Sequence, residues 1–323
     1  MKKLIALFLA LTMVVGFAAC GKLFSSLFGI DYMLAMVVSA AVIVIYCTLG
    51  GFLAASTTDF VQSIVMTIAL FVVVGFTEGL VHGFDAVFAN VQGLDGYLDL
   101  FKGFNVATGE TGSYGALPVA STLAWGLGYF GMPHILLRFM AIEKVEKIKL
   151  ARRVASVWVV ISMAVAIVIG IVGYGAVKSG AVSGIQDSER IIIELAKVIS
   201  GEGWLLAIVA GLILAGILAA TMSTADSQLL AASSSVSEDI MTALKVKINA
   251  KKKMLVARCS VVVIAIIAMF IAKDPNSNVF RIVSFAWAGF GATFGPLMLF
   301  SLFWKRINRA GAIAGMVGGG AMV

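Results

Sequence analysis

The sequence has few of the residues that soluble proteins and common enzyme classes depend on. Charged residues make up only 13% of its 323 residues, and it has just two histidines, three cysteines and four prolines. Soluble domains usually carry about 25% charged residues. The cysteines form no CxxC pair, and the chain has no HExxH motif, P-loop or GxSxG elbow. These absences argue against a disulfide framework, a zinc site and the usual hydrolase and nucleotide-binding chemistry.

Apolar residues, in contrast, are in large excess. They make up 61% of the chain, and the mean hydropathy is +1.04. A water-soluble fold cannot bury that much apolar surface, so part of the solvent must be lipid, and each span must be helical. Runs long enough to cross a bilayer lie at 33–55, 60–81, 117–140, 154–177, 204–230, 255–272 and 281–304, and another begins near Gly311. The sequence therefore predicts an all-α polytopic membrane protein.

The basic residues that give the chain its net charge of +7 are distributed in a way that indicates its membrane topology. Basic residues lie in short runs between the apolar stretches, such as Lys251–Lys253 and Lys305–Arg306, which we interpret as cytoplasmic anchors. With the amino terminus inside, only seven of the 24 basic residues fall outside: Lys22, Lys102, Lys178, Arg190, Lys197, Lys273 and Arg281. We therefore expect a multi-pass protein of the bacterial plasma (inner) membrane, which has the lipid bilayer as a partner and binds no nucleic acid.

Residues 1–21 have the pattern of a bacterial lipoprotein signal peptide. Lys2 and Lys3 form a basic start, a short apolar run follows, and Gly16–Cys20 resembles the motif at which a cysteine is lipidated and the chain is cleaved before it. The alternative is an ordinary membrane helix with a chance cysteine. The expected organisation is a signal-peptide-like segment at 1–21 and a transmembrane region at 22–323.

The span at 117–140 is interrupted by three glycines and a proline between Ala124 and His134. Proline removes a backbone donor, and secondary transporters build solute sites from discontinuous helices at this depth. Trp125 and Tyr129 are four residues apart and so share one helical face. Two interpretations stay open: a site for a small solute with an apolar body and polar ends, or helix packing through small residues.

Oxygen-bearing side chains gather in the span at 204–230. The hydroxyls of Ser223, Thr224 and Ser227 lie within about one turn, and Ala220 precedes them by one turn. Sodium is a hard cation that prefers such oxygen ligands. Serine and threonine also bond back to their own helix carbonyls, which is the alternative. Asp226 favours an ion site, because carboxylates at membrane depth are costly, unless it lies at the cytoplasmic mouth.

Two further features are less specific. Asp59 is the acidic residue between the first two full spans, and it is either the N-cap of the second span or a negative charge in a cation path. The glycine-rich run 284–296 is typical of close helix packing.

Several stretches, in this order along the chain, resemble the sodium:solute symporter family and most closely its proline-transporting members. The stretches are Gly50–Asp59, Trp125–Met140, Leu218–Leu230, Ser284–Pro296 and Ser301–Gly319, of which the last fits the family signature. The resemblance implies a partial inverted-repeat fold of five plus five core helices, in which the Trp125 helix opens the second repeat. It also implies import of proline or a related small solute by alternating access, with Na+ as the coupling ion and no transition metal.

The resemblance also assigns roles to individual residues. It places solute contacts at Trp125, Tyr129 and Pro133, and a sodium site at Ala220, Ser223 and Thr224. A second sodium site of some members uses positions that match Asp59, Ser223, Asp226 and Ser227. Met132 stands where the proline-transporting members have glutamine, so another small organic solute is an alternative.

Nothing in the chain resembles the family's first, unwound core helix, which completes both kinds of site. The signal-like segment takes the place of the third core helix. We therefore expect a symporter region that lacks the first core helices, is truncated at both ends, and is inactive as it stands. The alternatives are a non-transporting membrane-anchored fragment and a membrane enzyme or sensor, and the lack of any catalytic motif disfavours the enzyme.

Overall fold

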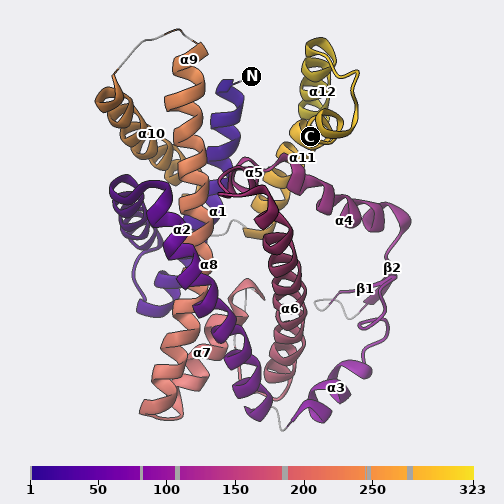
Figure 1. Ribbon diagram of the computed structural model, residues 1–323. Helices are drawn as coiled ribbons and strands as arrows, with labels where there is room; N and C mark the ends of the chain where they lie inside the picture. The colour runs from indigo at the N-terminus through magenta and orange to yellow at the C-terminus, as the bar shows by residue number, and fades with distance from the viewer. Residues whose placement is uncertain are drawn as a thin grey trace. The chain divides into compact units, whose positions relative to one another are not determined.

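The computed structural model describes residues 2–80, 83–105, 110–183, 188–243, 245, 249–274 and 279–323. The described part is mainly helical, and Figure 1 labels its α-helices and strands. In chain order they are α1 (Lys2–Phe28), α2 (Tyr32–Leu80), α3 (Phe84–Gln92), β1 (Lys102–Asn105), β2 (Glu110–Ser113), α4 (Ala116–Gly128), η1 (Tyr129–Gly131), α5 (Pro133–Met140), α6 (Val145–Lys178), η2 (Ser188–Arg190), α7 (Ile191–Gly201), α8 (Trp204–Ser234), η3 (Ser235–Ile240), α9 (Met241–Ala243), α10 (Ala250–Ile271), α11 (Val279–Phe303) and α12 (Arg309–Ala321).

Five helices of the described residues are long and apolar enough to cross a membrane. They are Tyr32–Gly79, Val145–Lys178, Trp204–Glu238, Lys251–Ile271 and Val279–Phe303. Many of their large apolar side chains are exposed, as expected where lipid replaces water. One feature departs from an all-helical chain: β1 and β2 pair as a short antiparallel ribbon, in which Lys102 lies opposite Ser113.

The two spans expected at 33–55 and 60–81 both fall within α2, in which two helical segments meet at a kink. Its helical geometry is broken at Gly51, which has φ 62° and ψ −157°. The break therefore precedes the polar run Ser56–Asp59, which lies between the two expected spans. Thr57 and Thr58 donate their hydroxyl hydrogens to the carbonyls of Leu53 and Ala54, so the polar run stays within the helix. Asp59 consequently lies inside α2, and its N-cap interpretation is wrong.

The chain forms two compact units. Unit 1 comprises 1–61, 124–143 and 220–323, and unit 2 comprises 62–123 and 144–219. The core of unit 2 is apolar and includes Ile169, Val172, Leu195 and Ile213. In this unit α7 buries one apolar face, which includes Leu195, Ala196 and Ile199.

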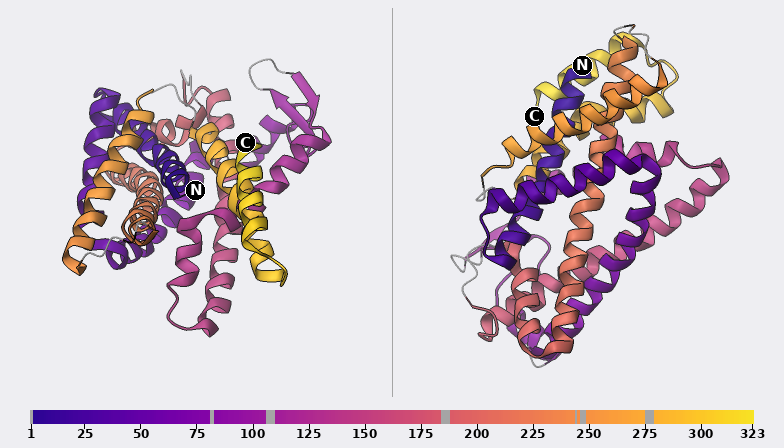
Figure 2. Two further views of the ribbon diagram at one scale, coloured as in Figure 1. Left: turned by 90° about the horizontal axis from the view of Figure 1, so that it is seen from above. Right: turned by 90° about the vertical axis from the view of Figure 1, so that its left-hand side faces the viewer.

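In unit 1, α1 lies beside α10 and α11 (Figure 2). The helix runs without interruption past residue 21, and Cys20 is buried with its Sγ 3.3 Å from Thr221 Oγ1. The signal-peptide interpretation stays a prediction. The side chains of Lys2 and Lys3, its expected basic start, and Lys247 of the charge count lie outside the described part.

The span at 117–140 is discontinuous, as its glycines and proline predict. Helix α4 ends at Gly128, a 3-10 turn follows, and Met132 is extended (φ −84°, ψ 111°) before Pro133 starts α5. The turn lies close to α11: a Cβ at Gly131 would overlap the Phe290 carbonyl, and Gly291 lies against Gly128. The run 284–296 therefore packs closely, as predicted.

Replacing Gly131 with alanine should destabilise unit 1 by about 1–3 kcal/mol, because the new methyl group must displace backbone of α11. Gly126→Ala is the matched control, since its Cβ meets nothing within 4 Å and alanine favours helix. Thermal unfolding in detergent micelles measures both. Equal melting temperatures for the two variants would contradict the close packing.

Candidate functional site

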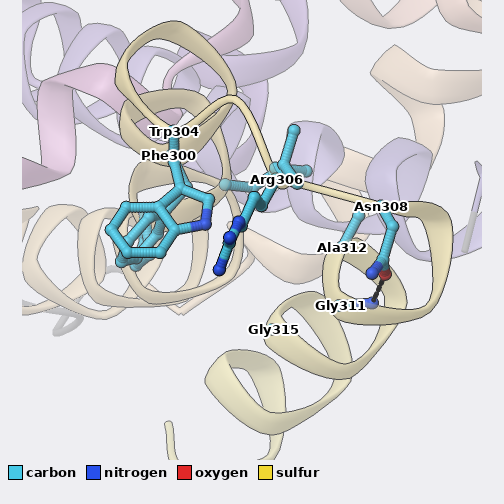
Figure 3. Close-up of a pocket in the computed structure, with 10 residues that line it drawn as sticks. Phe300, Trp304, Arg306, Asn308, Gly311, Ala312 and Gly315 are labelled. Carbon is cyan, nitrogen blue, oxygen red and sulfur yellow. Dashed lines mark hydrogen bonds between the residues drawn. The ribbon is translucent and has the colours of Figure 1, made fainter.

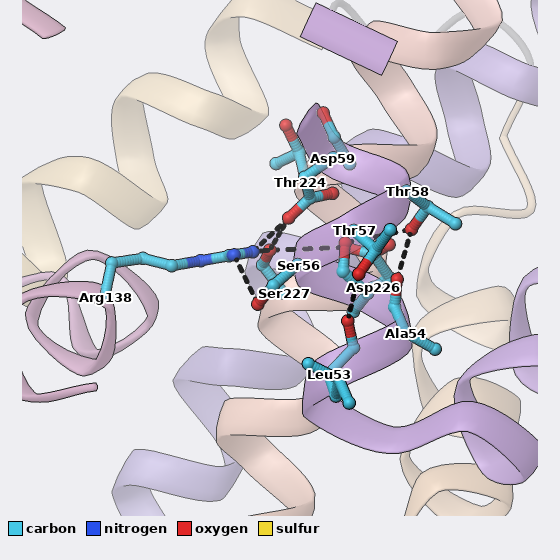
Figure 4. A network of polar contacts seen from close by, with 12 residues as sticks. Leu53, Ala54, Ser56, Thr57, Thr58, Asp59, Arg138, Thr224, Asp226 and Ser227 are labelled. Carbon is cyan, nitrogen blue, oxygen red and sulfur yellow. Dashed lines mark hydrogen bonds and ion pairs between the residues drawn. The ribbon is translucent and has the colours of Figure 1, made fainter. Parts of the chain in front are cut away.

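An ion-pair cluster in unit 1 joins α2, α5 and α8 (Figure 4). The guanidinium of Arg138 forms an ion pair with Asp59 and donates to Ser227 Oγ at 2.5 Å and to Ser56 Oγ at 3.0 Å. It also lies over the ring of Phe52, 5.5 Å from its centroid. Asp59 and Arg138 are both partly buried, with side-chain exposures of 17% and 35%. The oxygens of this cluster therefore already surround a cation.

Asp226 forms the buried end of the cluster. It is fully buried and accepts hydrogen bonds from Tyr46 Oη at 2.9 Å and from Ser227 Oγ at 3.2 Å. Ser227 Oγ is also 3.4 Å from Asp59 Oδ2, so this hydroxyl connects the two carboxyl groups. Asp226 has no exposed surface and is therefore buried within the protein, whereas its position between membrane depth and the cytoplasmic mouth stays a prediction.

The other oxygens expected to bind sodium also belong to α8, but they take part in hydrogen bonds within that helix. Ser223 Oγ and Thr224 Oγ1 each donate to the carbonyl of Ala220 at 3.1 Å. This is the back-bonding alternative, although an oxygen that donates its hydrogen keeps its lone pairs for a cation. Asp59 Oδ1 is buried and has no hydrogen-bond partner in the described part of the chain. An oxygen ligand is thus available at the cluster.

The expected solute residues lie in an aromatic cluster around Trp287 of α11. The ring centroid of Trp287 is 6.3 Å from Trp125, 5.5 Å from Tyr129 and 6.3 Å from His134. Pro133 begins α5, directly before His134. Trp287 Nε1 and His134 Nδ1 are buried and have no partner within the described residues. The cluster therefore combines an apolar surface with two unused polar atoms.

Sequence reasoning missed three residues that the structure brings to these clusters. Arg138 was counted as a cytoplasmic basic residue, although an arginine within an apolar segment is itself a functional signal. Trp287 was assigned to helix packing, and its indole lies against the two aromatic side chains that were expected to bind solute. Tyr46 had no sequence signal, since only the packing of α2 near α8 brings it to Asp226.

A discontinuous helix in a multi-pass membrane protein is a recurrent feature of secondary transporters. The model of the sodium:solute symporter family matches residues 2–319, and the chain belongs to this family. It is thus a member of a transporter family, not an enzyme. Among the described residues, no group of three or more histidine, cysteine, aspartate or glutamate side chains could hold a metal ion.

Several relatives that match the chain are proline transporters. The chain is 40% identical to the osmoregulated proline transporter OpuE of Bacillus subtilis (strain 168), an alignment that covers 99% of this chain and 62% of the relative. It is 38% identical to sodium/proline symporter 2 of Staphylococcus saprophyticus and to a sodium/proline symporter of Staphylococcus aureus, each over 95% of this chain and 58% of the relative. The chain thus spans about 60% of the length of these relatives.

A solved structure supports the fold assignment. The chain matches the substrate-bound outward-open state of a Na+-coupled sialic acid symporter with a TM-score of 0.71, over 97% of this chain and 66% of that one, at 20% identity. This match confirms the expected partial symporter fold. At this identity it carries no information on the solute.

Proposed function

We propose that this chain forms the ion- and solute-binding region of a secondary transporter that imports proline, or a related small solute, together with Na+ by alternating access. Family membership and the proline transporters among its relatives support this proposal. The observation that carries it is the cluster in which Asp59 and Ser227 hold the Arg138 guanidinium. Oxygens that are arranged around the guanidinium, a monovalent cation, also suit Na+, which carries the same charge.

The sodium residues of the proposal fall into two groups along α8. Asp59, Asp226 and Ser227 form the first group, joined by the hydrogen bonds of the Ser227 hydroxyl. The second group is Ala220, Ser223 and Thr224, where one carbonyl accepts from both hydroxyls. Ser223 is proposed for both groups, as the family resemblance implies.

Arg138 has a defined part in this proposal. Its guanidinium neutralises Asp59 while no sodium is bound, because an unpaired carboxylate at this depth is costly. Sodium that binds Asp59 and Ser227 must replace or share those oxygens. The ion therefore competes with a tethered cation, and its binding releases the Arg138 side chain, which lies in the last turn of α5, the helix that follows the break at Met132.

The solute residues of the proposal are Trp125, Tyr129 and Pro133, together with Trp287. The aromatic rings offer an apolar surface that suits the pyrrolidine ring of proline. The unpartnered Nε1 of Trp287 is a donor that suits the carboxylate. The cluster fits a small solute with an apolar body and a charged end, which proline exemplifies.

Uptake of radiolabelled proline tests the proposal. Cells that lack their own proline transporter express this chain, or this chain extended at its amino terminus by the corresponding segment of a longer relative. Uptake is measured in sodium and in choline medium of equal ionic strength, with surface expression quantified. We expect sodium-dependent uptake from the extended version.

Two other results have distinct meanings. Sodium-dependent uptake by the chain alone would contradict the expectation that it is inactive as it stands. If both versions reach the membrane and neither takes up proline, the solute is wrong, and a Met132→Gln variant then tests whether this position selects against proline.

A further inference from the structure

The connection between α11 and α12 encloses a groove that the symporter mechanism does not use (Figure 3). Helices α11 and α12 are in close contact near Gly319, where an added Cβ would overlap the carbonyl of Ala292. Toward the connection they leave a space of about 310 Å³, beginning at Pro296 within α11. This volume is within the usual range of ligand-binding cavities.

The groove has an apolar wall and a basic end. Leu297, Phe300, Ile307 and Ala312 line its sides, and the Arg306 side chain extends beside Trp304, between that ring and the start of α12. Trp304 packs edge-to-face on Phe300 at 6.2 Å and stays 55% exposed. No ion pair or hydrogen bond of the Arg306 side chain occurs within the described ranges, and residues 279–323 contain four basic residues and no acidic one. The chain itself therefore offers this arginine no neighbouring counter-charge along these helices.

The position of the groove along the membrane normal indicates what fills it. The candidate span of α11 ends at Phe303, so we expect Trp304 to lie at the membrane interface, where tryptophan is enriched, and Arg306 in the adjoining loop, as is common for arginine on the cytoplasmic side. The distribution of basic residues places this connection on the cytoplasmic side. The lipids of that leaflet are partly anionic, and basic pockets between helices on that side bind their head groups.

We propose that this groove binds an anionic phospholipid, with one acyl chain along the apolar wall and the phosphodiester at Arg306. The lipid supplies the negative charge that the surrounding sequence lacks, and its chain covers Phe300 and Ala312. Tryptophan beside the head group is the usual interfacial arrangement. This site is independent of sodium and solute binding, and it gives Arg306 a specific ligand in addition to its role as a topology anchor.

Quenching of tryptophan fluorescence by brominated lipids tests the proposal. The full chain is reconstituted in phosphatidylcholine vesicles that contain increasing fractions of dibrominated phosphatidylglycerol or dibrominated phosphatidylcholine. The contribution of Trp304 is the difference between the chain and its Trp304→Phe variant. We expect phosphatidylglycerol to quench this contribution half-maximally at about fivefold lower mole fraction, the preference expected from one arginine at the interface.

Matched variants separate the groove from general surface charge. Arg306→Gln should remove the preference, whereas Arg309→Gln, which removes the same charge outside the groove lining, should keep it. Gly315→Leu should block the groove, and Gly318→Leu on the same helix is its control, because a Cβ at either glycine meets nothing within 4 Å. Equal losses in Arg306→Gln and Arg309→Gln, or no preference in the unmodified chain, would overturn the proposal. Loss of the preference in millimolar inorganic phosphate would indicate a phosphate site rather than a lipid site.

Discussion

Sodium should raise the melting temperature of the chain when it is extended at its amino terminus by the corresponding segment of a longer relative, and the Asp59→Asn variant of this extended chain should lose the response completely. A ligand that binds only the folded state stabilises it by about 2.7 kcal/mol when its concentration is 100 times Kd. Asp59 provides the one carboxylate oxygen of the cluster that is buried and unpartnered in the described residues, so its neutralisation removes the strongest attraction for the ion. Thermal unfolding in detergent, with sodium exchanged for potassium at constant ionic strength, measures the effect.

The same substitution leaves Arg138 without its counter-ion, so the variant will also melt at a lower temperature in potassium. The double variant Asp59→Asn/Arg138→Gln should recover part of that loss and still fail to respond to sodium. Asp31→Asn is the control: it removes one carboxylate in front of the same helix, and asparagine replaces aspartate equally well as the cap of Leu34 N. A full sodium response in Asp59→Asn would exclude this residue from the ion site.

The sequence predicts those parts of the fold that depend on one segment at a time. The break before Pro133 follows from glycines and a proline in an apolar run, and the structure has an extended residue at Met132. By contrast, we expected Gly50 and Gly51 to lie within a continuous span. We also expected the polar run Ser56–Asp59 to lie between that span and the next. Gly51 adopts positive φ, and hydroxyl groups that bond back to the helix allow α2 to continue past Asp59.

The candidate site could be predicted only in part, because its residues come from separate helices. Asp59, Asp226 and Ser227 have a chemical signature, since oxygen-bearing side chains are rare in apolar segments. Which of them meet depends on how α2 and α8 pack, and this is not encoded in local spacing. The same limit explains why Arg138 was only counted among the cytoplasmic basic residues. Its partners are 79 and 89 residues away in the chain.

Replacing Arg138 with glutamine should strengthen sodium binding about tenfold. In the proposed mechanism sodium and the guanidinium compete for Asp59 and Ser227, and two unit charges 4 Å apart repel by about 4 kcal/mol at an effective dielectric constant of 20. The side chain is 35% exposed, so solvent screening lowers this cost, and about 1.4 kcal/mol, or tenfold in Kd, is the effect we expect. Binding of radioactive sodium to the purified, amino-terminally extended chain measures the Kd directly.

Arg138→Lys distinguishes competition from a merely structural role. Lysine keeps the charge but loses the fork that reaches Ser56 and Ser227 together, so its sodium Kd should stay close to that of the unmodified chain. Arg153→Gln, an exposed arginine of α6, should leave the Kd unchanged and controls for net charge. If Arg138→Gln and Arg138→Lys both weaken sodium binding, the guanidinium organises the ligands instead of competing for them. Sodium would then bind alongside Arg138, with Asp59 Oδ1 and Asp226 as its anionic ligands.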